Sequence, residues 1–145
     1  MNNILEQAQA IKNDIVEYRR TIHENPEVGD TLPKTKAYVM DKLRELGYEP
    51  KEICESGIVA TIEGPKPGKT FLLRADMDAL PMEETPNCDF ASKNGAMHSC
   101  GHDMHTAMLL GAAKLLRQNQ DQIEGTVKLV FQPDEEGFTG AKKMI

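Results

Sequence analysis

Three of the four histidines and one of the three cysteines of this chain fall within one run, MHSCGHDMHTAMLLG, at residues 97–111. Cys100, His102 and Asp103 offer a thiolate, an imidazole and a carboxylate, a set that suits borderline divalent metals such as Zn²⁺, Mn²⁺, Co²⁺ or Ni²⁺. Cys100 and His102 are two positions apart, so a helix would not place them on one face. A loop could, because Gly101 frees the backbone to aim both side chains at one point. The run is therefore a candidate metal site.

Two other interpretations of this run stay open. Asp103 could lie near the cap of a helix while Cys100 is a small buried side chain, and for an isolated Cys-x-His pair this is the favoured interpretation, because free cysteines are often buried. Cys100 and His102 could also form a nucleophile pair, although such partners usually come from distant chain positions.

Two further polar clusters follow predicted strands. Asp76 and Asp78 come after TFLLR, and a metal-bound imidazole often leans on such a carboxylate. Asp134, Glu135 and Glu136 come after TVKLVFQP, where one Glu could hold a metal while its neighbour takes a proton from water. Taken alone, each cluster is typical of an ordinary acidic turn. Together the three clusters supply soft ligands, hard ligands and a spare base, which favours one shared metal site.

The elements that must position these clusters alternate helices with strands. Apolar residues at helical spacing predict helices at 3–24, at 32–46 and from about 104 onward. Runs rich in β-branched residues predict strands at 57–64, 70–77 and 126–132. Residues 79–97 are expected to be irregular, and 139–145 to open one more helix. This order predicts an α/β layer fold, in which ligands bind beyond the carboxyl ends of the strands.

The ends of the first two helices carry capping signals. Asn3 and Glu6 fit a capping box, while Thr31 followed by Pro33 fits the start of the second helix and Gly47 fits its end. In the second helix, the residues expected to face inward are Ala37, Met40, Leu43 and Leu46.

The charge, the apolar stretches and the cysteines of the chain exclude some kinds of binding partner and cellular location. A net charge of −6 and a pI of about 5.2 argue against nucleic acid, which needs a basic face. No apolar stretch is long enough to span a membrane, and the N-terminus lacks the basic start and apolar block of a signal peptide. Cys54, Cys88 and Cys100 are odd in number and widely spaced, so we expect no disulfide framework and a cytoplasmic protein.

Four motifs, RRTIHENPEVG, LLRADMDALPMEE, MHSCGHDMHTAMLLGAAKLL and GTVKLVFQPDEEGFTGA, follow one another in the order and spacing of the M20-type metallopeptidases. From about Tyr18 to its end the chain resembles the amidohydrolase branch of that family, which includes hippurate hydrolases, N-acyl-amino-acid amidohydrolases, auxin-conjugate hydrolases and N-acetyldiaminopimelate deacetylases. The resemblance implies a three-layer helix–sheet–helix catalytic domain with two divalent metal ions. It also implies hydrolysis of the amide bond of a small-molecule N-acyl amino acid.

The same resemblance implies roles for individual residues. Cys100 would be the bridging or shared metal ligand, His102 a terminal ligand and Glu136 a ligand of the other metal. Glu135 would be the general base and proton shuttle. The remaining residues would support them: Asp76 or Asp78, with Asp76 favoured, would orient the metal-bound histidine, and Asp103 and His105 would lie behind the ligands.

Members of that family run to several hundred residues and carry two more histidine ligands and an inserted dimerisation domain. Residues 1–145 are therefore expected to be the N-terminal part of the catalytic domain of a homodimeric enzyme, with the inserted domain and the C-terminal part absent. Alone, this fragment is expected to have little or no activity. A second hypothesis is that the short chain is a non-catalytic remnant, or a module that binds a metal or a partner.

Overall fold

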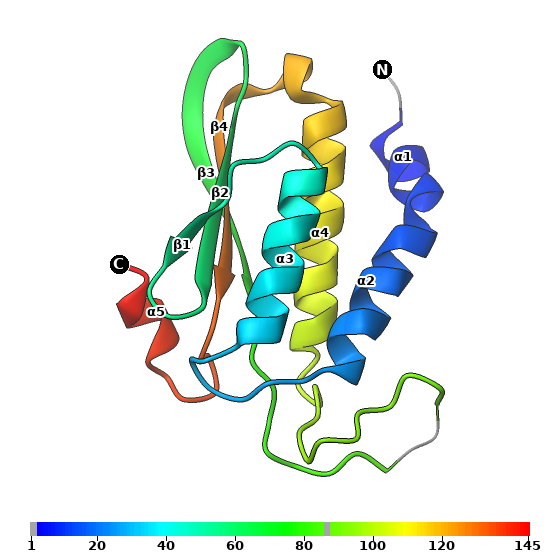
Figure 1. Ribbon diagram of the computed structural model, residues 1–145. Helices are drawn as coiled ribbons and strands as arrows, with labels where there is room; N and C mark the ends of the chain where they lie inside the picture. Colours follow the sequence, from blue (N-terminus) through cyan, green and yellow to red (C-terminus); the bar gives the residue numbers. More distant parts are fainter. Residues whose placement is uncertain (1–2, 86–87) are drawn as a thin grey trace.

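The computed structural model describes residues 3–85 and 88–145, and it alternates helices with strands as the sequence predicts (Figure 1). The helices are α1 (Ile4–Ala10), α2 (Lys12–Glu24), α3 (Pro33–Glu45), α4 (His102–Gln118) and α5 (Gly140–Lys143), with a 3₁₀ turn at Gln120–Gln122. The strands are β1 (Lys51–Ile53), β2 (Gly57–Glu63), β3 (Lys66–Asp76) and β4 (Glu124–Gln132). The predicted α/β class is confirmed. In this described part of the chain, no helix is both long and apolar enough to cross a membrane.

The described strands form one mixed sheet in the order β1-β2-β4-β3. β2 pairs antiparallel with β1 and with β4, whereas β3 runs parallel to β4, with Leu73 opposite Leu129 and Asp76 opposite Gln132. A parallel pair needs a long crossover connection, which α4 and the loop before it supply. As a result, β3 and β4 end side by side, close to the start of α4.

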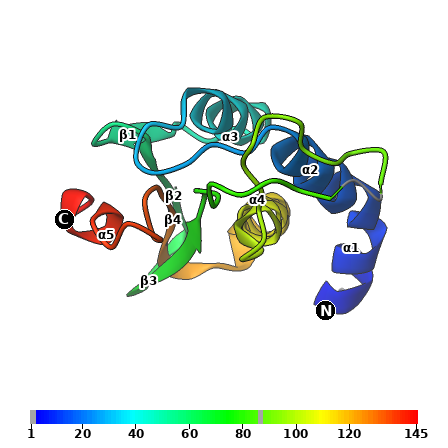
Figure 2. The ribbon, with the colours of Figure 1, turned by 90° about the horizontal axis from the view of Figure 1, so that it is seen from below.

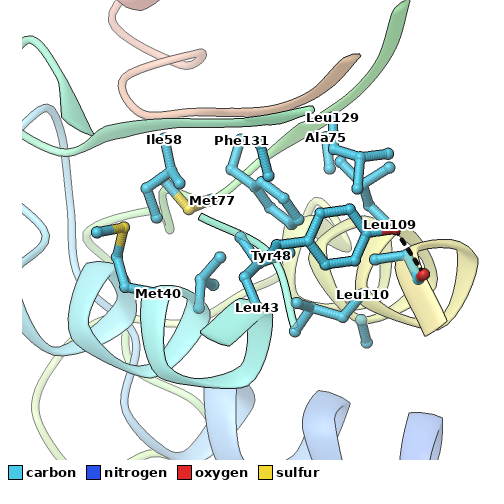
Figure 3. Packing of buried hydrophobic residues seen from close by; sticks show 14 of the residues in the cluster. Met40, Leu43, Tyr48, Ile58, Ala75, Met77, Leu109, Leu110, Leu129 and Phe131 are labelled. Carbon is cyan, nitrogen blue, oxygen red and sulfur yellow. Dashed lines mark hydrogen bonds between the residues drawn. The ribbon is translucent and has the colours of Figure 1, made fainter. Parts of the chain in front are cut away.

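The core lies between one face of this sheet and the helices α2, α3 and α4, which Figure 2 shows on the same side. Alternate residues of β2 and β4 point to that side, because successive side chains of a strand face opposite ways. Ile58 and Phe131 are fully buried there against Leu43 of α3 and Leu110 of α4 (Figure 3). Each such buried side chain contributes about 1.5–3 kcal/mol relative to an exposed one.

The helix predicted over 3–24 is two helices, so that prediction was wrong about its continuity. The break is at Ile11, whose backbone angles are φ −95° and ψ 11°. Asn3 does cap α1, because its side chain accepts the N–H of Leu5. Beyond the break, Ile15 packs closely on Gly111 of α4, where an added Cβ would lie 2.8 Å from the Ile15 Cδ1 atom. The helical spacing of apolar residues runs through the break, so the spacing does not reveal it.

The start of α3 also differs from the prediction. Leu32 occupies the N-cap position instead of Thr31, and the apolar side chain of Leu32 makes no capping hydrogen bond. Instead, the carboxylate of Glu27, which lies outside the helix, caps it: it accepts the N–H of Lys34 at 3.1 Å and the N–H of Thr35 at 2.8 Å. Of the four residues expected to face inward, Met40 and Leu43 are buried and Leu46 is half-buried, but Ala37 is exposed and Val39 takes its place.

Two strands differ from the prediction as well. β1 was not predicted, because it is short and mostly polar. β3 begins at Lys66, four residues before the predicted start at Thr70, and its register is irregular between these two residues. In the described residues, the stretch 79–97 contains no helix and no continuous strand, as predicted. Single β-bridges pair Ala79 with Val28 and Leu80 with Met97. Two residues of that stretch, 86 and 87, lie outside the described part.

Candidate metal site

The three polar clusters singled out in the sequence meet where β3 and β4 end and α4 begins. The ligand atoms of Cys100, His102 and Glu136 all lie within 4.8 Å of one another. Gly101, between the first two, has φ +85°, a left-handed conformation that glycine adopts without strain. The predicted loop geometry therefore brings the thiol and the imidazole to one point, and the loop after β4 adds the carboxylate.

His102 is the first residue of α4, two positions earlier than the predicted start of that helix. Its Nδ1 lies 2.8 Å from the backbone oxygen of Asp78, and its Nε2 lies 3.7 Å from carboxylate oxygens of both Asp76 and Glu135. Burial disfavours the imidazolium, but the hydrogen bond to Asp78 and the charges of Asp76 and Asp78 outweigh it and raise the pKa of His102 to about 9. In the neutral tautomer with its proton on Nδ1, the Nε2 lone pair can bind a cation, so a cation competes with the second proton for that nitrogen.

Asp78 is almost fully buried and joins three parts of the site. Its two carboxylate oxygens accept the backbone N–H of Glu135 at 2.9 Å and of Glu136 at 3.1 Å. Burial opposes ionisation, yet the hydrogen bonds from His102 and from these two N–H groups prevail and lower the pKa of Asp78. The Asp78 carboxylate lies 3.6 Å from the Nδ1 of His102, and the Asp76 carboxylate lies 3.7 Å from its Nε2. Both aspartates named from the sequence therefore lie beside this histidine, and the preference for Asp76 stays a prediction.

Asp76 holds a different histidine. One of its oxygens lies 2.6 Å from the Nδ1 of His105, and the other accepts a hydrogen bond of 2.8 Å from Arg74. Asp76, His102 and His105 also form a second group whose ligand atoms lie within 4.8 Å of one another. His105 is thus a candidate ligand, whereas the family resemblance implies only a supporting place for it. The sequence does contain a signal for this ligand: His102 and His105 are three positions apart, and residues three apart share one face of a helix.

Cys100 is exposed, so the interpretation that it is a small buried side chain was wrong. The hydrogen bond and charge of Glu136, followed by the charge of Glu135, raise the pKa of the Cys100 thiol. Glu136 Oε1 is buried and finds no hydrogen-bond partner among residues 3–85 and 88–145. An unpartnered carboxylate oxygen beside a thiol and an imidazole is the donor set that borderline divalent metals prefer. The residues therefore fit such ions.

Asp103 lies in the first turn of α4, and its side chain is fully buried. It does not cap the helix. One of its oxygens instead lies 2.7 Å from the Nε of Arg19 and 2.7 Å from the Nδ1 of His23. No local pattern in the sequence connects Arg19 or His23 with the site, because both belong to α2 and lie about 80 residues away in the chain.

The chain is similar to known proteins in sequence and in structure. Residues 72–145 match the model of peptidase family M20/M25/M40. The chain is 50% identical to thermostable carboxypeptidase 2 of Saccharolobus solfataricus, over 94% of this chain and 38% of that protein. It is 43% identical to the N-acyl-L-amino acid amidohydrolase of Geobacillus stearothermophilus, over 93% of this chain and 37% of that protein.

A solved structure is similar too. The Bacillus subtilis YXEP protein, described as a dinuclear metal-binding peptidase of the M20 family, superposes with a TM-score of 0.89 and 40% identity. The match covers 93% of this chain and 38% of that one. The chain thus spans less than two fifths of the length of these relatives.

Proposed function

The chain belongs to peptidase family M20/M25/M40, and we propose that it forms the metal-binding part of an amidohydrolase that cleaves N-acyl amino acids. The observation that carries this proposal is the convergence of Cys100, His102 and Glu136, with their ligand atoms within 4.8 Å of one another. The amidohydrolase among the relatives supports the reaction class, and the dinuclear metal-binding peptidase supports a site for two metal ions.

In this proposal Cys100, His102 and Glu136 would hold two divalent ions. When bound, such ions would polarise the amide carbonyl and make a water molecule more acidic. His105 offers a further nitrogen on the Asp76 side of His102. Zn²⁺, Mn²⁺, Co²⁺ and Ni²⁺ all suit these ligand types.

Glu135 is the proposed general base. It accepts a proton from the attacking water and delivers it to the leaving amine, a task that suits a partly exposed carboxylate beside the ligands. Its side chain is 36% exposed, and its Oε2 lies 3.7 Å from the Nε2 of His102. Asp78 holds Glu135 and Glu136 in place through their backbone N–H groups, so the base and its neighbouring ligand share one support.

Residues 1–145 are proposed to be the N-terminal part of the catalytic domain. The relatives are more than twice as long, and the proposed enzyme would draw its remaining ligands, a dimerisation domain and its substrate pocket from further sequence. We expect the complete protein to be a homodimer that acts on a small-molecule N-acyl amino acid.

Activity should be measured on the complete gene product with a panel of N-acetyl and N-benzoyl amino acids, alongside blocked dipeptides as carboxypeptidase substrates. Glu135→Gln is expected to lower kcat by about 10²- to 10⁴-fold while metal content is unchanged, because the base is lost but the ligands remain. Cys100→Ala is expected to lower metal content, measured by elemental analysis.

Glu83→Gln is the matched control for Glu135→Gln, because Glu83 is an exposed glutamate of the loop before α4. It should leave both turnover and metal content unchanged. Full turnover in Glu135→Gln would remove Glu135 as the base, and unchanged metal content in Cys100→Ala would remove Cys100 as a ligand.

A further inference from the structure

The motif RRTIHENPEVG supplies no residue to the metal site, yet two of its side chains reach toward it. Arg19 and His23 project from α2 into a polar cluster with Asp103 of α4 and Glu84 of the loop before α4. Arg19 Nε donates to Asp103 Oδ2 at 2.7 Å, and His23 Nδ1 lies 2.7 Å from the same oxygen. His23 Nε2 lies 2.9 Å from Glu84 Oε1. We call these four residues the α2 cluster.

Three members of the α2 cluster are closed to solvent, whereas the side chain of Arg19 is 30% exposed. The side chains of His23, Asp103 and Glu84 are 4%, 1% and 9% exposed. The other oxygen of Glu84 accepts the backbone N–H of Ser92 at 2.7 Å, which extends the connection further along the loop. Removing one partner from such a buried set leaves a charge without compensation, which is far more costly than breaking a surface pair. The cluster therefore holds α2, the loop and the start of α4 in one arrangement.

The start of α4 needs support of this kind. Gly101 at its N-cap has no side chain, and no side-chain hydrogen bond caps the helix. The metal-site residues lie on either side of that glycine, with Cys100 in the loop and His102 as the first helical residue. Asp103 is the next residue along the chain, so fixing its carboxylate also fixes the neighbouring imidazole.

We propose that Arg19 and His23 are positioning residues for the metal site: through Asp103 and Glu84 they set where Cys100 and His102 stand. This inference rests on the proposed function, because it takes those two residues as metal ligands. Neighbouring groups that orient a ligand commonly change metal affinity by about 10- to 100-fold when they are removed.

The test compares Arg19→Gln with Arg20→Gln in the complete gene product. The two arginines are matched, because each guanidinium lies 4.9 Å from the centre of the Phe90 ring, but only Arg19 contacts Asp103. Co²⁺ is the probe, since a thiolate bound to it gives a charge-transfer absorption band. Arg19→Gln is expected to weaken Co²⁺ binding by about 10- to 100-fold and to reduce that band at saturating Co²⁺. Arg20→Gln is expected to match the wild type in both.

A second pair of variants, at His23, distinguishes a positioning role from a loss of stability. His23→Asn keeps a donor near the Nδ1 position that faces Asp103, whereas His23→Gln keeps one near the Nε2 position that faces Glu84. The Asn variant is expected to retain the tighter Co²⁺ binding and the stronger band, even where the two variants melt at the same temperature. Equal binding in both His23 variants, or in both arginine variants, would overturn the inference.

A comparison of the wild type with Cys100→Ser distinguishes a failure of this inference from a failure of the proposed function. If the wild type shows no charge-transfer band, or if Cys100→Ser keeps it, the proposed metal site is wrong and the inference falls with it. If the band depends on Cys100 but Arg19→Gln behaves like Arg20→Gln, the metal site stands and only the positioning role is wrong.

Discussion

Asp78 illustrates how much of the site depends on one side chain. Its carboxylate fixes the backbone of two consecutive glutamates, and its backbone oxygen faces the imidazole of His102. The proposed base, one proposed ligand and the orientation of another therefore share one buried anchor. A small displacement of Asp78 would move all three together, so the site behaves as one unit.

At the same scale, Tyr48 offers a test that is independent of the metal site. Its hydroxyl donates to the backbone oxygen of Ala113 at 2.8 Å, as the dashed line in Figure 3 shows. Tyr48→Phe removes this buried bond and is expected to lower the free energy of unfolding by about 1 kcal/mol at neutral pH, measured by urea denaturation.

The pH dependence of stability gives a second readout for that variant. Burial raises the pKa of Tyr48 to about 12, although the charge of Arg117 opposes the rise. The unfolded chain loses the phenol proton near pH 10, before the folded protein does, so stability is full below that pH and falls as pH rises toward about 12. Tyr48→Phe should show a smaller loss over this range. An equal loss would show that Tyr48 does not cause it.

The residue types at the site were predictable, but the detailed contacts were not. The Cys-x-His spacing and the paired glutamates point to metal chemistry, and the structure brings those groups together. The choice between Asp76 and Asp78 was not accessible, because alternate residues of a strand share one side and only the path of the chain beyond β3 separates them. The contacts of Arg19 and His23 with Asp103 depend on tertiary packing across some 80 positions, which local patterns do not record.

At the scale of elements, α3 depends on a cap that comes from outside its own first turn. The Glu27 carboxylate accepts the N–H groups of Lys34 and Thr35, and also the Thr35 hydroxyl at 2.9 Å. Glu27→Ala is expected to lower the free energy of unfolding by about 1 kcal/mol, since it leaves those donors without a partner at the positive end of the helix. Chemical denaturation measures this directly.

Glu49→Ala is the control for that change. Glu49 is an exposed loop residue close to the other end of α3, and an ordinary surface substitution changes stability by less than about 0.5 kcal/mol. Equal effects of the two variants would contradict the capping role of Glu27.

The sequence predicted the type of every long element and erred mainly at the ends. Hydrophobic periodicity located α2, α3, α4 and the three longer strands, because each buries one face. It placed the start of α4 at Met104, since His102 and Asp103 are polar although both are buried. It missed β1, whose residues Lys51 and Glu52 are exposed and join the sheet through backbone pairing with β2.

At the scale of the whole molecule, β3 occupies one edge of the sheet. In the described part of the chain its outer side pairs with no other strand, and Phe71 and Leu72 are 58% and 61% exposed. An exposed apolar edge strand is a template for pairing with another chain. A protein of residues 1–145 alone is therefore expected to self-associate, which sedimentation velocity would detect.

Leu72→Lys is expected to reduce that association, because a charge on an edge strand opposes pairing. Thr61→Lys is the matched control: Thr61 and Leu72 both lie opposite Lys128, so each variant adds the same charge beside the same neighbour. Thr61, however, belongs to an inner strand. If both variants reduce association equally, net charge rather than the β3 edge is responsible.

The position of β4 has a consequence for how the chain acquires its fold during synthesis. β2 and β3 are consecutive in the chain but do not pair, because β4 lies between them. A ribosome adds roughly 5–20 residues per second, so both early strands must wait several seconds for their shared partner. Until residues 124–132 emerge from the exit tunnel, only the β1–β2 pair and the helices α1 to α4 can form. The apolar segment of β3 therefore has no partner strand during that interval.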